Sequence, residues 1–282
     1  MTKLGVVDVG GGLRGAYASA VLDFCQDEGI HFDCCVGVSA GSANLSSYLS
    51  GQRGRNIPFY LDYPQRKEYM SFRNFVRTGS YLDLEYLYGT LSNSDGENPL
   101  DYEALCANPA EFYVVAQRAD TGEAVYFTKD DMAQDDYRIL MASSCLPGVD
   151  KPYVIDGVPY FDGALADPVP VKKAFELGCD QVLLILTKPA DVPREVGKDR
   201  YSAKMIRKKY PKSADNLMKR AERYNAGVDY AKSRVDDGSV LIVAPSDTGG
   251  VSTLSKDAEL LKRFYDRGYE DAHAVTTWLE RA

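Results

Sequence analysis

Residues 4–15 read LGVVDVGGGLRG, and residues 32–41 read FDCCVGVSAG. In each stretch an apolar run, typical of a buried parallel strand, ends in a glycine-rich turn. Helical patterns follow over residues 13–28 and 42–50. A strand, a helix, a second strand and a second helix at this spacing form a βαβ unit. The sequence therefore predicts an α/β fold with a parallel sheet.

The rest of the chain continues the α/β pattern and adds two hairpins, each closed by a turn sequence containing Asp and Gly. The expected elements are hairpins at 111–117 with 124–128 and 153–155 with 158–161, helices at 136–145, 171–177 and 256–282, and strands at 181–187 and 240–244. The last helical segment contains Gly268, where we expect a break.

We expect a catalytic α/β domain over residues 1–190 and a C-terminal helical extension over residues 191–282, with one further strand, packed on the core. Residues 58–94 differ in composition, because nine aromatic residues lie there among charges and chain-breaking residues. Two interpretations of this segment stay open. It is a satellite hydrophobic cluster, or it is a cap whose aromatic side chains line an acyl-chain groove.

Composition narrows the class of protein. Of 282 residues, 45% are apolar, and the net charge of −8 argues against a nucleic-acid partner. No apolar run is long enough to cross a bilayer and no signal-peptide pattern follows Met1, so we expect a cytoplasmic protein.

Residues 188–223 hold twelve Lys or Arg against five Asp or Glu. This basic helical stretch is either solvated or makes transient peripheral contact with a membrane surface.

Cysteine and histidine patterns point away from metal chemistry. Five of the six cysteines lie in or beside apolar segments, no CxxC pair occurs, and no Cys/His cluster has metal-ligand spacing. We expect reduced thiols, no metal and no cofactor.

The turn at residues 37–41, Gly37-Val38-Ser39-Ala40-Gly41, has the composition of a nucleophile turn. Small residues on both sides of Ser39 permit a sharp strand-to-helix turn that exposes the hydroxyl group. A serine hydroxyl is a weak nucleophile until a base removes its proton and donors stabilise the oxyanion. Ser39 is therefore the candidate nucleophile of an acyl-transfer reaction.

The turn at residues 10–15 is the candidate oxyanion hole. Three consecutive glycines let backbone N–H groups point at one place without interference from a Cβ. We expect Gly10, Gly11 and Gly12 to form the hole, with Gly11 and Gly12 as the preferred donors and Gly10 allowing the turn. Arg14 either anchors this loop or pairs with an acidic group.

The base is expected to be a carboxylate, because neither histidine is well placed. His31 precedes the strand that ends at Ser39, and eight extended residues put it about 26 Å away. His273 lies in the last helical segment. Asp162 ends a short strand and is followed by Gly163, which leaves room for a substrate. Partial desolvation must raise the proton affinity of Asp162 for it to act as a base.

Three motifs, GGGLRG at residues 10–15, GVSAG at 37–41 and Asp162-Gly163-Ala164, resemble in their order and spacing the patatin-like phospholipase family. The resemblance extends over about residues 3–190 and includes Gly15, Gly37 and Gly41 as motif residues. It implies a three-layer α/β/α sandwich with a mainly parallel central sheet, a Ser39–Asp162 dyad that needs no metal, and hydrolysis of acyl esters of lipids or phospholipids. Asp167-Pro168 departs from the Asp-Asn more usual in the family, which is a minor loop difference.

Two alternatives to a serine lipid acyl hydrolase stay open. GGGLRG also matches the dinucleotide pattern GxGxxG, although the second strand ends at Val38-Ser39 without the acidic residue that holds a ribose. The alternatives are a nucleotide-binding protein that uses residues 10–15 on phosphate, and a catalytically silent family member that binds lipid. For the hydrolase, the expected partner is a lipid or acyl-ester substrate.

Overall fold

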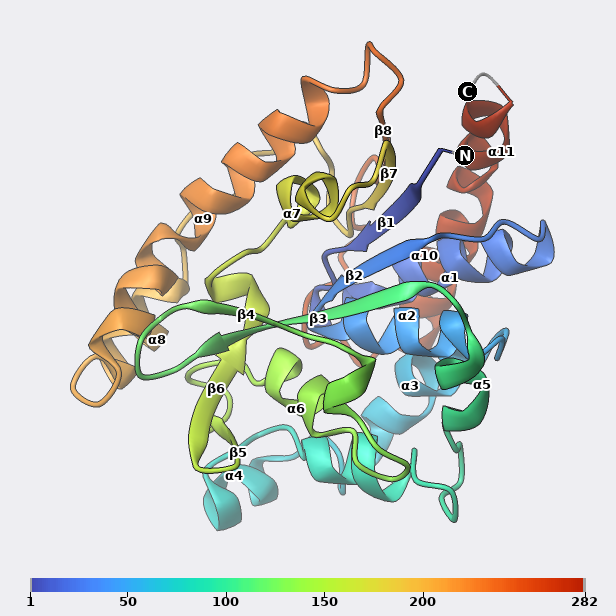
Figure 1. Cartoon of the computed structure of the whole chain (residues 1–282). Coiled ribbons are helices and arrows are strands. Elements are labelled where there is room, and N and C mark those ends of the chain that lie inside the picture. The colour runs from blue at the N-terminus through green and yellow to red at the C-terminus, as the bar shows by residue number, and fades with distance from the viewer. Residues whose placement is uncertain (1, 281–282) are drawn as a thin grey trace.

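The computed structural model describes residues 2–280, in which one mixed sheet of eight strands lies between two layers of helices (Figure 1). The strands are β1 (Leu4–Asp8), β2 (Cys34–Val38), β3 (Glu111–Arg118), β4 (Ala124–Phe127), β5 (Tyr153–Ile155), β6 (Val158–Asp162), β7 (Gln181–Ile185) and β8 (Val240–Val243). Their order is β5-β6-β3-β2-β1-β7-β8, with β4 paired to β3. The five strands β3, β2, β1, β7 and β8 are parallel, whereas the pairs formed by β4, β5 and β6 are antiparallel.

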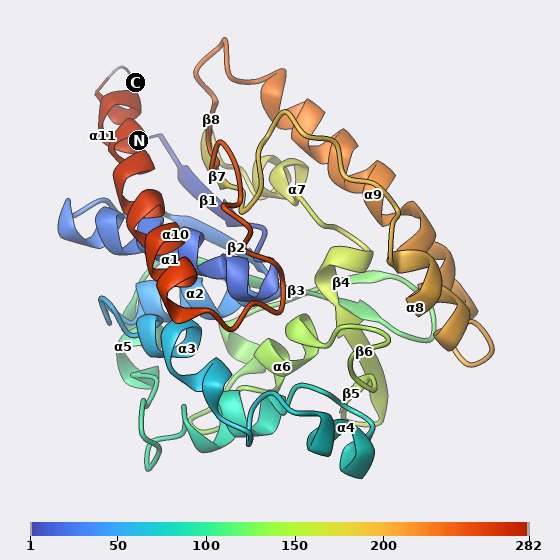
Figure 2. The ribbon, with the colours of Figure 1, turned by 180° about the vertical axis from the view of Figure 1, so that it is seen from behind.

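The helices cover both faces of the sheet. They are α1 (Gly15–Asp27), α2 (Ala40–Leu49), α3 (Ile57–Leu61), α4 (Phe72–Thr78), α5 (Tyr102–Ala107), α6 (Arg138–Ser144), α7 (Val171–Glu176), α8 (Asp199–Ile206), α9 (Pro211–Lys232), α10 (Ala258–Asp271) and α11 (His273–Leu279). Helices α1, α2 and α10 lie over one face and α7 and α9 over the other (Figures 1 and 2). The predicted three-layer α/β/α sandwich with a mainly parallel sheet is confirmed.

The two-residue period of the strands separates the two cores. On β1 and β2, Val6 and Cys35 point into the core shared with α1, whereas Val7 and Val36 point into the core shared with α9. Strands that are apolar on both faces need a helix layer on each side. The apolar runs at residues 4–9, 32–38 and 181–187 correspond to the central strands β1, β2 and β7, whereas the run at 240–244 forms the edge strand β8.

The basic stretch differs from the expected one. Residues 188–198 are irregular rather than helical, because Pro189 and Pro193 each lack an N–H and restrict the preceding residue. Helix α9 then extends beyond residue 223, to Lys232. One face of α9 is buried against the sheet, so the stretch is only partly exposed.

The expected helix break at Gly268 is wrong. Helix α10 runs through Gly268 without interruption and gives way to α11 only at Ala272. A Cβ at position 268 would lie 3.0 Å from Tyr17 Cα. The glycine is therefore needed for close contact between α10 and α1, not for a change of chain direction.

Candidate active site

Ser39 occupies the turn between β2 and α2 in a conformation that is rare for a residue with a side chain. Its φ is 57° and its ψ is −131°, which is a strained backbone region. The Ser39 N–H donates to Ser143 Oγ at 2.8 Å, and Ser143 Oγ donates to the Val115 carbonyl at 2.6 Å. Ser143 on α6 therefore ties the strained turn to β3. Ser143 belongs to the stretch Ala142-Ser143-Ser144, which also fits the family resemblance but lies outside the three motifs.

The sheet places Asp162 next to Ser39 in two steps. Val38, the last residue of β2, pairs with Val115 of β3. Asp162, the last residue of β6, pairs with Ala116, the next residue of β3. Ser39 and Asp162 therefore flank the same point of β3, although they are far apart in the sequence.

Asp162 has the environment of a candidate base. Its side chain is buried, with 1% exposure, and its Oδ1 accepts the Ala164 N–H at 2.8 Å. Burial raises the pKa of Asp162, whereas the nearby Ser39 hydroxyl, the Ala164 N–H and the charge of Arg220 act in the opposite direction. A buried carboxyl with raised proton affinity beside a serine hydroxyl can accept the serine proton.

The glycine loop presents two free donors rather than three. The Gly10 N–H donates to Asp8 Oδ1 at 2.8 Å, and the Gly10 carbonyl accepts a bond from Thr187 at 2.5 Å. The Gly10 N–H thus anchors the loop, which fits the role expected for Gly10 of allowing the turn, with Gly11 and Gly12 as the preferred donors. The N–H groups of Gly11 and Gly12 make no hydrogen bond within residues 2–280. Both residues line a cleft that also contains Ser39.

Asp8 supports the loop from below. Its Oδ2 accepts a bond from Asn44 at 2.9 Å, and the Tyr60 hydroxyl donates to Asn44 Oδ1 at 2.7 Å. Burial raises the pKa of Asp8 to about 6. This buried network connects β1, α2 and α3, so Asp8 holds the loop in shape and does not face the cleft.

Arg14 anchors the glycine loop to a distant part of the chain. Its guanidinium donates to the Thr253 hydroxyl at 3.0 Å, and the Thr253 carbonyl accepts the Leu13 N–H at 3.0 Å. Of the two roles open to Arg14, the structure therefore contains the anchor. The remaining motif glycines, for which a Cβ would meet neighbouring atoms closely, are Gly15, Gly37, Gly41 and Gly163.

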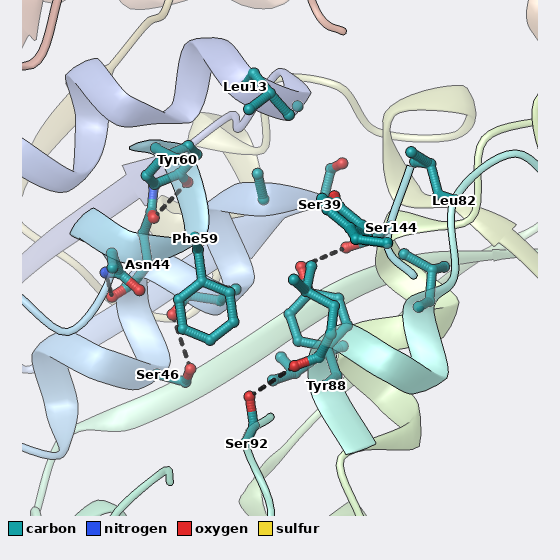
Figure 3. A pocket seen from close by; sticks show the side chains of 18 of the residues that line it. Leu13, Ser39, Asn44, Ser46, Phe59, Tyr60, Leu82, Tyr88, Ser92 and Ser144 are labelled. Carbon is teal, nitrogen blue, oxygen red and sulfur yellow. Dashed lines mark hydrogen bonds between the residues drawn. The ribbon is translucent and has the colours of Figure 1, made fainter. Parts of the chain in front are cut away.

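An apolar pocket begins at Ser39 and extends beneath the segment of residues 58–94 (Figure 3). Its cavity volume is about 60 Å³, and its lining includes Phe59, Leu82, Leu87 and Tyr88. Most of the lining side chains from this segment are buried and apolar. The aromatic segment thus faces the candidate nucleophile, which composition alone left undecided.

A second, wider cleft of about 680 Å³ meets the apolar pocket at Ser39. Asp162, Gly11 and Gly12 line it, together with cationic residues of the segment that follows β7. The two cavities share lining residues at their junction, which are Gly12, Ser39, Leu146, Thr253 and Leu254. Sequence reasoning missed Thr253 and Leu254, because no motif marks the loop after β8.

Neither histidine lines a cavity that contains Ser39. His31 lies in a groove with Thr2 and Asp33, beside the first residues of β1. The His273 ring packs edge-on against Phe24, with ring centroids 4.7 Å apart. Within the part of the chain that the structure describes, a histidine-based triad at Ser39 is therefore not formed.

Residues 2–280 lack two further features, a metal-binding cluster and a membrane-spanning helix. No group of three or more His, Cys, Asp or Glu side chains there is arranged to hold a metal ion. No helix there has both the length and the apolar character required to cross a membrane. All six cysteines are free thiols, as expected.

Comparison with known proteins identifies relatives for both parts of the chain. The family model described as "Patatin-like phospholipase" matches residues 9–175, and one described as a domain of unknown function (DUF6363) matches residues 210–280. The chain is 31% identical over 197 residues to "Uncharacterized protein YjjU" of Escherichia coli (strain K12), covering 67% of this chain and 53% of that protein. The chain thus spans about half the length of this relative. The fold is similar to VipD from Legionella pneumophila, with a TM-score of 0.52 and 14% identity over 100% of this chain and 67% of VipD.

Proposed function

The chain belongs to the patatin-like phospholipase family, and on this basis we propose that it is a serine lipid acyl hydrolase that cleaves carboxylic esters through Ser39 and Asp162. The observation that carries the proposal is the position of Ser39. It is a strained turn residue that meets buried Asp162 on one side and an apolar pocket on the other. Strain at a turn is retained where it positions a reacting group.

The reaction follows from the groups around Ser39. Asp162 accepts the Ser39 proton while Oγ attacks the ester carbonyl, and the Gly11 and Gly12 N–H groups donate to the oxyanion. The leaving alcohol recovers the proton from Asp162. Asp162 then deprotonates a water molecule, whose oxygen attacks the acyl-enzyme. The acyl bond to Ser39 breaks, Asp162 returns the proton to Ser39 Oγ, and the carboxylic acid leaves.

The apolar pocket is proposed to hold the acyl chain. Its lining of buried Leu, Tyr and Phe side chains suits a hydrocarbon, because apolar surface is favourably removed from water there. In this arrangement residues 58–94 form a cap over the bound acyl chain. Residues 1–190 then constitute the catalytic domain, and residues 191–282 the extension that packs on it.

Transient contact with a membrane surface is part of the proposal. Exposed apolar side chains stand next to cations on two short helices: Phe72 and Val76 on α4, and Tyr201 and Met205 on α8. Both helices adjoin the loop of residues 146–151. After α4, the Tyr81 N–H donates to the Val149 carbonyl at 2.9 Å. On the other side, Gly148 lies against Ser202 of α8. Leu146 of this loop lines both cavities. The exposed side chains thus lie near the entrance to the site.

Hydrolysis kinetics on a short neutral p-nitrophenyl ester test the proposal. Ser39→Ala and Asp162→Asn are each expected to lower kcat by at least about 10³-fold, because each removes a group that acts in the chemical step. Asp156→Asn is the matched control, since Asp156 is also followed by glycine but lies in an exposed hairpin turn. Full activity of Asp162→Asn would remove the carboxylate from the mechanism.

A further inference from the structure

The wide cleft beside Ser39 is rich in cations. Five basic side chains line it: Arg14, Lys188, Arg194, Lys198 and Arg220. Three carboxylates also line it: Asp162, Glu195 and Asp199. Arg220 donates two hydrogen bonds to Asp199, one of them at 2.8 Å. Because Arg220 and Asp199 neutralise each other, four cations remain in the cleft against the two carboxylates Asp162 and Glu195.

Two of these cations have unsatisfied donors. The Nε atoms of Arg14 and Arg194 are buried without a hydrogen-bond partner. Arg194 is 3.6 Å from Asp199, the carboxylate that Arg220 already holds, and the Thr253 hydroxyl to which Arg14 donates is neutral. A buried charged donor left unpaired is unfavourable, so the arrangement suits an anion that brings several oxygen acceptors.

Lys188 adds a third cation to the same place. It forms no ion pair with another side chain of residues 2–280, and burial together with the charges of Arg14, Arg194 and Arg220 lowers its pKa to about 8. The lowered pKa indicates that the positive charges of these four side chains lie close enough to repel one another. A bound anion would relieve that repulsion and keep Lys188 protonated.

The cations line the same cleft as Ser39, so they can contact the part of the ester that lies in this cleft. An ester carbonyl at Ser39 with its acyl chain in the apolar pocket directs its alcohol part into the wide cleft, because the two cavities meet at Ser39. The phosphate of a glycerol phosphate has oxygen acceptors that match arginine and lysine donors.

We propose that Arg194 and Lys188, together with Arg14, bind a phosphate group on the alcohol part of the ester, so that the substrate is a phosphate-bearing acyl ester. This inference rests on the proposed function. Lys188 and Arg194 lie outside residues 9–175, the range of the family match. The proposed phosphate site therefore combines one residue of the family-matched part, Arg14, with two residues that follow it.

The test compares two substrates with the same decanoyl chain, a lysophosphatidate and a monoacylglycerol. Arg194→Gln and Lys188→Gln are each expected to lower kcat/KM for the lysophosphatidate about 10- to 100-fold, the value of a hydrogen bond to a charged group. Turnover of the monoacylglycerol by Lys188→Gln should stay within about 3-fold of wild type, since a neutral headgroup makes no such bond. An equal loss on both substrates, or no loss on either, overturns the inference.

Two controls remove the same charges elsewhere. Arg263 and Lys219 are exposed and line neither cavity, so Arg263→Gln and Lys219→Gln should leave both substrates unaffected. If these variants lose lysophosphatidate turnover as strongly as Arg194→Gln does, the effect comes from long-range charge and the phosphate site is overturned.

Labelling of Ser39 with a fluorophosphonate separates this inference from the proposed function. A wild-type chain that takes no label overturns the hydrolase and its substrate together, whereas a labelled chain without phosphate discrimination overturns the phosphate site alone. Calorimetric titration of Ser39→Ala with inorganic phosphate identifies the source of the phosphate. Weak binding, with a Kd of about 1 mM or more, that Arg194→Gln removes agrees with a lipid-borne phosphate. Micromolar binding without substrate discrimination would assign the cleft to a free anion and overturn the proposal.

Discussion

Asp162 illustrates how burial turns an ordinary carboxyl into a candidate base. An exposed aspartate has a pKa of about 3.9 and is a poor proton acceptor. At Asp162 burial is the main effect, and it raises the pKa. The Ser39 hydroxyl, the Ala164 N–H and the charges of two arginines, Arg220 and Arg194, limit this rise. These opposing effects keep the group ionisable and at the same time strengthen it as a base.

The raised pKa of Asp162 predicts the acid side of the pH–rate profile. Because the base works only when ionised, kcat/KM should fall as the pH decreases through the raised pKa, and this fall should begin above the pH expected for an exposed aspartate. The measurement is kcat/KM for a neutral ester between pH 4 and pH 8. A profile that stays flat down to about pH 4 would be inconsistent with a buried carboxylate base.

At the scale of elements, the segment of residues 58–94 and helix α2 together shape the apolar pocket. Ala43 on α2 lines this pocket, and its small side chain leaves space for the substrate. Ala43→Leu is expected to lower kcat/KM for a decanoyl ester about 10-fold and to spare an acetyl ester, because three added carbon atoms take up space in the cavity that only the longer acyl chain needs. The ratio of the two rates is its own control, since loss of folding would lower both. An unchanged ratio would place the acyl chain elsewhere.

The success of prediction from sequence also varies by element. The central strands and the hairpins were predictable, because apolar runs and Asp-Gly turns are local signals. The irregular residues 188–198 and the continuous helix at Gly268 were not. In the second case the decisive contact is with the backbone of Tyr17, about 250 residues earlier in the chain, and no local pattern carries such information.

At the scale of the whole molecule, the site is assembled from both ends of the chain. The nucleophile turn, the glycine loop and Asp162 could be identified as motifs, since each is a short sequence with a fixed chemical meaning. Thr253, Lys188 and Arg194 could not, because their roles depend on how the last third of the chain folds back over the first strand. Pairing of β8 with β7 fixes that return path.

Contact with a membrane is also a property of the whole molecule. Replacing Tyr201 and Met205 with serine is expected to reduce co-sedimentation with phosphatidylglycerol vesicles about 10-fold, because two exposed apolar side chains no longer enter the lipid. Val235→Ser is the control, as Val235 is exposed in the loop between α9 and β8, at the end of α9 that is far from α8. Hydrolysis of a monomeric short ester should not change. Undiminished sedimentation of the double variant would contradict the assigned surface.

The central claim is that Ser39 is an activated nucleophile served by Asp162. The most direct measurement is to treat the protein with a fluorophosphonate probe and to map the labelled residue by mass spectrometry, with Ser39→Ala and Asp162→Asn alongside. We expect one adduct, at Ser39, which is absent from Ser39→Ala and forms at least about 10²-fold more slowly in Asp162→Asn. A folded protein that takes no label, or a label on another residue, would contradict it.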